Sequence, residues 1–67
     1  MTIGQKLRAA RDQAGLTQES VAETLGVTRQ TIIAIENDKY NPTLELAMRL
    51  ARHLNVAVEQ IFQLEEP

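Results

Sequence analysis

The chain contains no cysteine and no tryptophan, and it has one histidine, one tyrosine and one phenylalanine. Without cysteine it can form neither a disulfide bridge nor a thiolate metal site, and His53 alone is a poor basis for any other metal site. No apolar run is long enough to cross a bilayer, and no signal-peptide pattern is present. We therefore expect a cytoplasmic protein with no membrane contact and no metal or other cofactor.

The arrangements that catalysis requires are missing as well. The acidic residues are not paired with a nucleophile, a glycine-rich loop or a metal-ligand cluster, so we do not expect an enzyme. With no separate sensor domain, we also expect no small-molecule ligand. The 67 residues make a single domain, 1–67, whose small core leaves it only marginally stable by itself. Helix packing, and a partner subunit, must supply the stability.

The net charge of −2 argues mildly against a nucleic-acid partner, because such partners are usually bound by basic proteins. The distribution of charge matters more than its sum. The early basic residues are Lys6, Arg8, Arg11, Arg29 and Lys39, and the late acidic residues are Glu59, Glu65 and Glu66. We expect a weakly basic face opposite an acidic one, and the alternative is a mixed, solvated surface without functional meaning.

Two short apolar patterns at helical spacing dominate residues 17–36. The first consists of Val21, Ala22 and Leu25, and the second of Ile32 and Ile35. Between them Gly26 can take the left-handed conformation that ends a helix, and the hydroxyl of Thr28 can cap the next one. The pattern predicts a helix over 18–25, a tight turn, and a second helix over 29–36.

The small side chain of Ala22 allows the second helix to cross the first closely and steeply. If Ile32 and Ile35 face the core, the outward side of the second helix carries Arg29, Gln30, Ile33 and Ala34. This layout is typical of a DNA-reading helix-turn-helix, in which the start of the second helix enters the major groove.

Three further helices complete an all-α, five-helix prediction, at 4–14, 44–54 and 58–62. The expected inner residues of the first are Leu7, Ala10 and Ala14, and those of the second are Leu44, Ala47, Leu50, Ala51 and Leu54, with Leu46 and Met48 on its flank. Ala57 is a weak cap for the last helix. Residues 1–3 are either disordered or an edge strand, and residues 63–67 are either a strand or frayed coil.

The sequence resembles the lambda Cro/CI-type (XRE) helix-turn-helix regulators over nearly its whole length. The residues that carry the resemblance are Leu16–Gln18, Ala22, Gly26–Ile32, Ile35–Glu36, Asn41–Thr43 and Ile61–Phe62. The short length and the ending resemble the compact dimeric regulators of the cytolysin-repressor type. The resemblance implies a lambda-repressor-like domain that binds double-stranded DNA sequence-specifically and regulates transcription. It would act as a repressor, with a homodimer on a two-fold symmetric operator, and activation from an adjacent site is the alternative. The rival interpretation is a protein-interaction module, such as the antitoxin of a toxin–antitoxin pair.

Candidate base contacts lie along the second helix of the pair. Arg29 can bond a guanine edge in a bidentate way, and Gln30 can do the same with adenine, although both could simply be solvated. Thr28, besides its capping role, can reach a phosphate or a thymine methyl. Ile33 is either an ordinary exposed residue or a contact to thymine methyls, and Ala34 beside it cannot hydrogen-bond a base.

Candidate phosphate contacts flank this helix: Gln18, Thr31, Lys39, Tyr40 and Asn41. The amides at the start of helix 18–25 suit a phosphate oxygen, and by resemblance Gln18 bonds the DNA backbone and braces Arg29. Lys39 and the Tyr40 hydroxyl are reasonable phosphate donors, although the Tyr40 ring could instead lie on helix 44–54. By resemblance, Arg11 and Glu36 form a structural ion pair that fixes the reading helix to helix 4–14.

A single reading helix covers too little of a groove to select a site tightly, and helix-turn-helix proteins overcome this by dimerising. The apolar residues available for an interface are Met48, Val58, Ile61, Phe62 and Leu64, within or near the proposed dimerisation segments 1–3 and 56–66. Some of them must close the monomer core instead, and we expect Phe62 to be shared between the core and the interface. By resemblance, Met1–Ile3 and Phe62–Leu64 would pair as a small antiparallel ribbon.

Overall fold

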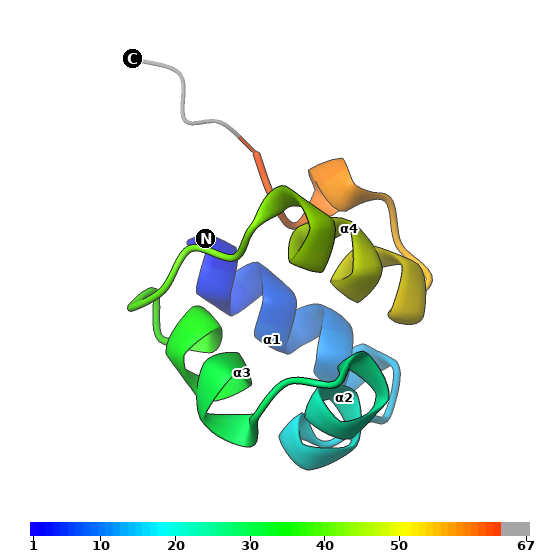
Figure 1. The fold of residues 1–67 in the computed structure, drawn as a ribbon. Helices are drawn as coiled ribbons and strands as arrows, with labels where there is room; N and C mark the ends of the chain where they lie inside the picture. The colour runs from blue at the N-terminus through cyan, green and yellow to red at the C-terminus, as the bar shows by residue number, and fades with distance from the viewer. Residues whose placement is uncertain (64–67) are drawn as a thin grey trace.

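The computed structural model describes residues 1–63, which form four α-helices and one turn of 3-10 helix (Figure 1). The α-helices are α1 (Ile3–Gln13), α2 (Gln18–Leu25), α3 (Arg29–Glu36) and α4 (Leu44–His53), and the 3-10 turn is η1 (Val58–Gln60). Residues 1–63 contain no strand, so the described chain is all-α, as the sequence predicts. The bounds of α2 and α3 agree with the predicted ones.

Every α-helix begins directly after a threonine whose side-chain oxygen accepts a backbone N–H from the first turn. At α1 this threonine is Thr2, and the Gln5 side chain accepts the Thr2 N–H in return. The interpretation of residues 1–3 as an edge strand or disordered segment is therefore wrong, because Thr2 caps α1 and Ile3 begins it. The predicted terminal ribbon loses its first strand.

The predicted fifth helix is only a single 3-10 turn. Ala57 has no side-chain oxygen to accept an amide of that turn, and the one capping bond runs from the Ala57 N–H to Oε1 of Gln60 at 2.8 Å. With only half of a capping box, the segment 58–62 does not extend into an α-helix. Leu64, which was predicted both for the ribbon and for the dimer interface, lies outside the described residues.

One apolar core joins all the helices. Its fully enclosed side chains are Leu7, Val21, Ile32, Ile35, Leu50 and Ile61. Two of these, Ile32 and Ile35, fix the face of α3 that points inward, and the small Ala22 on α2 is buried beside them at 3% exposure. The close packing of α2 against α3 thus follows from the residues that the sequence pattern singles out.

The inner faces of α1 and α4 differ from their predicted ones. On α1 the buried residues are Gly4, Leu7 and Arg11, whereas Ala14 is exposed. On α4 Leu46 is buried and Leu44 is 74% exposed, which reverses the prediction for these two residues. Either leucine fits a helical repeat with Ala47 and Leu50, so the spacing could not decide which one faces the core.

The start of α1 lies directly on the end of α3. A Cβ atom added to Gly4 would overlap the carbonyl oxygen of Glu36, so only glycine allows the two backbones to approach this closely. The start of α1 and the end of α3 are therefore in direct backbone contact.

We expect Gly4→Ala to lower the free energy of unfolding by about 1–3 kcal/mol, because an added methyl group would force the two helices apart. Alanine has the better helix propensity, so a purely local effect would go the other way. Urea denaturation measures the change, and Arg8→Ala, at an exposed position of the same helix, should stay within about 0.5 kcal/mol of the parent. An unchanged or raised midpoint for Gly4→Ala would contradict the close contact.

Candidate nucleic-acid interface

The turn between α2 and α3 is built by local hydrogen bonds. Gly26 takes the left-handed conformation, with φ of 72°, and the N–H of Val27 donates to the carbonyl of Ala22 at 3.0 Å. Thr28 then accepts the N–H of Thr31 at 3.3 Å, and the two hydroxyls lie 3.1 Å apart. These bonds fix the side chains of Thr28 and Thr31 in the first turn of α3.

The leading end of α3 is open to solvent. Arg29 and Gln30 are exposed, and Ile33 and Ala34 behind them are half-buried. On the opposite side of the helix Ile32 is 0% exposed and Ile35 1% exposed. The helix is therefore held down by its isoleucines with its first turn free, which is the orientation that a groove-reading helix requires.

The trailing end of α3 is fixed by a buried ion pair. Nε of Arg11 donates to Oε2 of Glu36 at 2.7 Å, and a second guanidinium nitrogen donates to Oε1 at 3.2 Å. The Glu36 side chain is only 3% exposed and that of Arg11 11% exposed. Arg11 also donates to the carbonyl of Leu16 at 2.8 Å, so the guanidinium joins α1, the turn after it and α3.

The hydrogen bond to Glu36 raises the pKa of Arg11, and this outweighs the effect of burial, which lowers it. The bond to Glu36 thus favours the charged form of the guanidinium. The pair is an electrostatic link between α1 and α3 with little exposed surface.

Gln18, expected to contact phosphate and to brace Arg29, is hydrogen-bonded to Glu36 within the protein, and its contact to phosphate stays a prediction. Its side-chain nitrogen donates to Oε1 of Glu36 at 3.0 Å, and that oxygen is thereby shared with Arg11. The side chain is half-buried. The start of α2 is tied in this way to the end of α3.

The loop after α3 is anchored by Asp38, a residue that the sequence reasoning did not single out. Its backbone is left-handed, with φ of 60°, and Oδ1 accepts the N–H of Gly4 at 2.9 Å. Two hydrogen bonds lower the pKa of Asp38 below its ordinary value: the bond with the Thr2 side chain has the larger effect, and the bond from the Gly4 N–H the smaller one. We call the bond between Gly4 and the Asp38 carboxylate the Asp38 clasp. The stability that the charged carboxylate adds is fully present above the ordinary pKa of an aspartate and is lost as the pH falls through the lowered one.

The Asp38 clasp presents the next residues outward. Lys39, Tyr40 and Asn41 are all exposed, and the Lys39 N–H donates to the carbonyl of Ala34 at 2.8 Å. Tyr40 borders a hollow that it shares with the start of α1 and the end of α3, and its neighbours there include no α4 residue. These three residues thus flank the trailing end of α3, as a set of phosphate contacts would.

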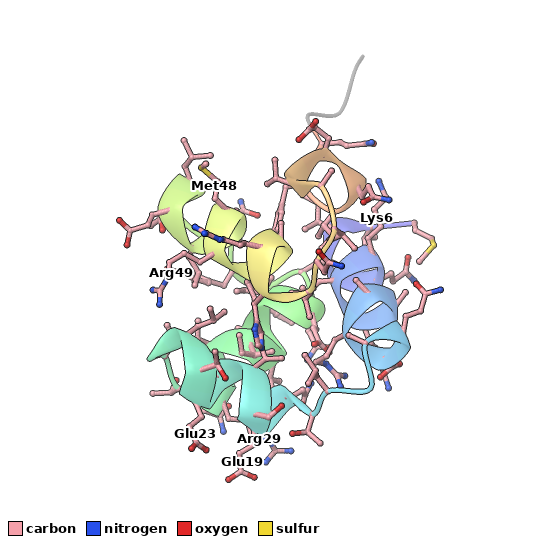
Figure 2. The ribbon with its side chains drawn as sticks, turned by 90° about the vertical axis from the view of Figure 1, so that its right-hand side faces the viewer. Lys6, Glu19, Glu23, Arg29, Met48 and Arg49 are labelled. Carbon is pink, nitrogen blue, oxygen red and sulfur yellow. The ribbon has the colours of Figure 1, made fainter. Side chains whose placement is uncertain are left out.

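The charge around Arg29 is mixed. Arg29 and Glu19 line one hollow at the starts of α2 and α3, and Figure 2 shows Glu23 at the same end of the molecule. The sequence analysis counted Arg11 as part of a basic face, but its charge is paired with that of Glu36. The surface that carries the leading end of α3 is therefore less basic than the sequence suggested, so phosphate attraction would contribute less to any binding there.

Residues 7–61 match the Helix-turn-helix family model. The chain belongs to this family, in its XRE branch. It is 51% identical over 61 residues to an uncharacterised HTH-type transcriptional regulator of Methanocaldococcus jannaschii, covering 91% of this chain and 92% of that one. Helix-turn-helix proteins of this kind are DNA-binding regulators of transcription and not enzymes.

Two further comparisons agree with this family. The chain is 38% identical over 61 residues to the immunity repressor protein of Bacillus phage phi105, covering 91% of this chain and 42% of the repressor. The restriction-modification controller protein C.AhdI of Aeromonas hydrophila superposes with a TM-score of 0.83 at 32% identity, covering 90% of this chain and 87% of that one.

The residues predicted for a dimer interface have different environments in this helix-turn-helix protein. Met48 on α4 is 54% exposed, and Val58 and Phe62 are partly buried. Ile61 is 1% exposed and belongs to the core, so it has no surface to offer a partner. The side chain that closes the monomer at this end is therefore Ile61, and Phe62 packs partly against the same core.

Residues 1–63 contain no group of three histidine, cysteine, aspartate or glutamate side chains that could hold a metal ion. In the same part of the chain, no helix has the length and apolarity needed to cross a membrane.

We expect Glu36→Ala to lower the free energy of unfolding by about 3 kcal/mol or more, because it strands the buried Arg11 charge and removes the partner of Gln18. Glu23→Ala, at an exposed position on α2, should change stability by less than about 0.5 kcal/mol. Thermal and urea unfolding of the two variants would decide the matter, and equal midpoints would show that the pair does not hold α3.

Proposed function

We propose that this helix-turn-helix regulator binds double-stranded DNA in a sequence-specific way, with the first turn of α3 in the major groove. The observation that carries the proposal is the contrast along α3. Arg29 and Gln30 stand in solvent, whereas Ile32 is completely enclosed one turn from Arg29. Guanidinium and carboxamide groups are the side chains best suited to bond guanine and adenine edges.

The remaining contacts would position the protein on the duplex. Thr28 and Thr31 flank the start of α3, and Lys39, Tyr40 and Asn41 lie exposed beyond its end. In this arrangement hydroxyl, ammonium and amide donors would meet phosphates on both sides of the reading helix. Ile33 and Ala34, half-buried behind Arg29 and Gln30, would contribute apolar contact to the groove floor.

The proposed action is repression by a homodimer on an operator with two-fold symmetry, with half-sites about 34 Å apart. An immunity repressor among the relatives supports the repressive sense. The exposed Met48 and the partly exposed Val58 and Phe62 supply apolar surface for dimerisation. Bound at a promoter in the cytoplasm, such a dimer would block the polymerase by occupying its site.

The rival function, a protein-interaction module such as an antitoxin, requires the outward face of α3 to suit a protein partner. That face carries Arg29, Gln30 and Thr31 and no acidic residue. The acids nearby, Glu19 and Glu23, belong to α2. The face of the reading helix itself thus favours DNA.

Arg29→Ala should relax the preference for one base pair in each half-site, at a cost of about 1–3 kcal/mol for the preferred sequence and little for others. Gel-shift titrations against the duplex upstream of its own coding sequence, with each base pair varied in turn, measure this. Unchanged preference at every position would remove Arg29 from direct readout.

Lys39→Ala is the matched comparison, because it removes one exposed positive charge without touching α3. It should weaken binding to all duplexes by a similar factor and reduce the slope of log affinity against log salt by about one unit. If Lys39→Ala instead changed base preference, the division between reading and positioning residues would be wrong.

A further inference from the structure

Asp38 occupies a backbone position at which glycine is the usual residue. In the turn that ends α3, the Asp38 N–H donates to the carbonyl of Ile35 at 3.1 Å. The Lys39 N–H donates to the carbonyl of Ala34 at 2.8 Å. These two bonds form a Schellman motif, whose left-handed residue is commonly glycine because a side chain there is strained. Asp38 takes this conformation with φ of 60°, and such strain persists only where other contacts fix the residue.

The Asp38 clasp supplies the contact that fixes this residue. Gly4, whose N–H donates to the carboxylate at 2.9 Å, lies 34 residues earlier in the chain. Figure 1 shows the start of α1 beside the segment that leaves α3. α1 has no acidic residue in its own first turn, so the Asp38 carboxylate provides the negative group at the positive end of this helix. The Thr2 side chain bonds the same carboxylate. The negative charge of Asp38 is therefore bound by α1.

The exposed residues Lys39, Tyr40 and Asn41 begin directly after the clasp. Tyr40 and Asn41 line a hollow of about 270 Å³ together with Thr2 and Asp38, so this segment follows the start of α1. A loop that is free to move loses conformational entropy when it binds a partner, whereas a loop already held in its bound conformation avoids that cost. A bond at the residue that precedes the loop thus fixes the position of all three side chains relative to α1 and α3.

Charge alone predicts the opposite role for Asp38. A carboxylate adjacent to Lys39 in the chain would repel the phosphate that Lys39 meets, so its removal would strengthen the binding of every duplex. A carboxylate that holds the loop in place has the reverse effect, because its removal releases the phosphate donors. The two roles give changes of opposite sign for the same substitution, and they can therefore be separated by experiment.

We propose that Asp38 is a positioning residue for DNA binding: by accepting the Gly4 N–H it holds residues 39–41 in the conformation that meets phosphate, and an acidic side chain thereby strengthens the binding of an anion. This proposal rests on the proposed function, to which it adds a residue that does not itself touch the duplex. The role requires the hydrogen-bond acceptor of Asp38 and not its charge.

Two substitutions separate the acceptor from the charge. Asp38→Gly removes both and keeps the left-handed turn without strain, whereas Asp38→Asn removes only the charge and tolerates the same conformation. Asp38→Gly should weaken binding to the upstream duplex and to an unrelated duplex by a similar factor, at least about fivefold. Asp38→Asn should bind both within about twofold of the parent, or more tightly. Fluorescence anisotropy titrations measure the affinities, at a temperature at which circular dichroism shows every variant to be folded.

A double-mutant cycle distinguishes positioning from a general effect on stability. Because Asp38 acts through the loop, Lys39→Ala should weaken binding by a smaller factor in the Asp38→Gly background than in the parent. Asp38→Gly alone should also lower the slope of log affinity against log salt towards that of Lys39→Ala. A residue that only stabilised the fold would lower the unfolding midpoint and leave both measurements unchanged, and that result would overturn the proposal.

The chain offers a matched control for each change. Asn55 is the left-handed residue of the same kind of turn after α4, with φ of 59° and the Val56 N–H donating to the carbonyl of Ala51 at 3.0 Å. Asn55→Gly should leave DNA affinity within about twofold of the parent, and so should Glu59→Gln, which removes one exposed negative charge on η1. If Asp38→Gly and Asp38→Asn both bind more tightly and to the same extent, Asp38 is only a repelling charge and the proposal is overturned.

The same titrations keep this proposal separate from the proposed function. If the parent selects its upstream duplex and Asp38→Gly binds as tightly as the parent, the positioning role fails and DNA recognition stands. If the parent binds all duplexes equally and Asp38→Gly weakens all of them, the positioning role stands and sequence-specific recognition fails. A parent that binds no duplex would overturn both.

Discussion

The arrangement of this domain depends on the carboxylate of Glu36. It receives two hydrogen bonds from Arg11 and one from Gln18, so a single buried side chain at the end of α3 is tied to α1 and to the start of α2. A buried charge is tolerated only when its partners satisfy it fully, and here both oxygens are bonded. The same end of α3 is fixed by the backbone contact at Gly4 and by the Asp38 clasp.

This concentration of constraints at one end explains why the other end can be free. Arg29 and Gln30 need no contact with the body of the protein, because Ile32, Ile35 and Glu36 already hold their helix in place. A reading helix must meet a groove with its side chains pre-positioned and their polar groups unengaged. One end of α3 is fixed to the rest of the protein and the other is exposed to solvent, and this difference is the physical basis of the proposed recognition.

Local chemistry made much of this predictable from the sequence. Threonine caps and Gly26 define α2 and α3, and the spacing of Ile32 and Ile35 sets which side of α3 is exposed. What the sequence could not provide were contacts between distant positions. Nothing in the turn residues at Asn37 and Asp38 indicates a bond back to Gly4, and both Leu44 and Leu46 fit the repeat of α4. Family resemblance assigned Gln18 to DNA and to Arg29, and it gave no indication that the Gln18 amide donates to Glu36 in the folded chain.

The central claim is that DNA meets the first turn of α3, and a nuclear magnetic resonance titration of the uniformly labelled protein with its upstream duplex tests it most directly. The account predicts that the largest amide and side-chain shifts fall on residues 28–31, with a second group at 39–41, while the enclosed methyl groups of Ile32 and Leu50 change least. Shifts concentrated on α4 and η1, with the signals of Arg29 and Gln30 unmoved at saturation, would contradict it.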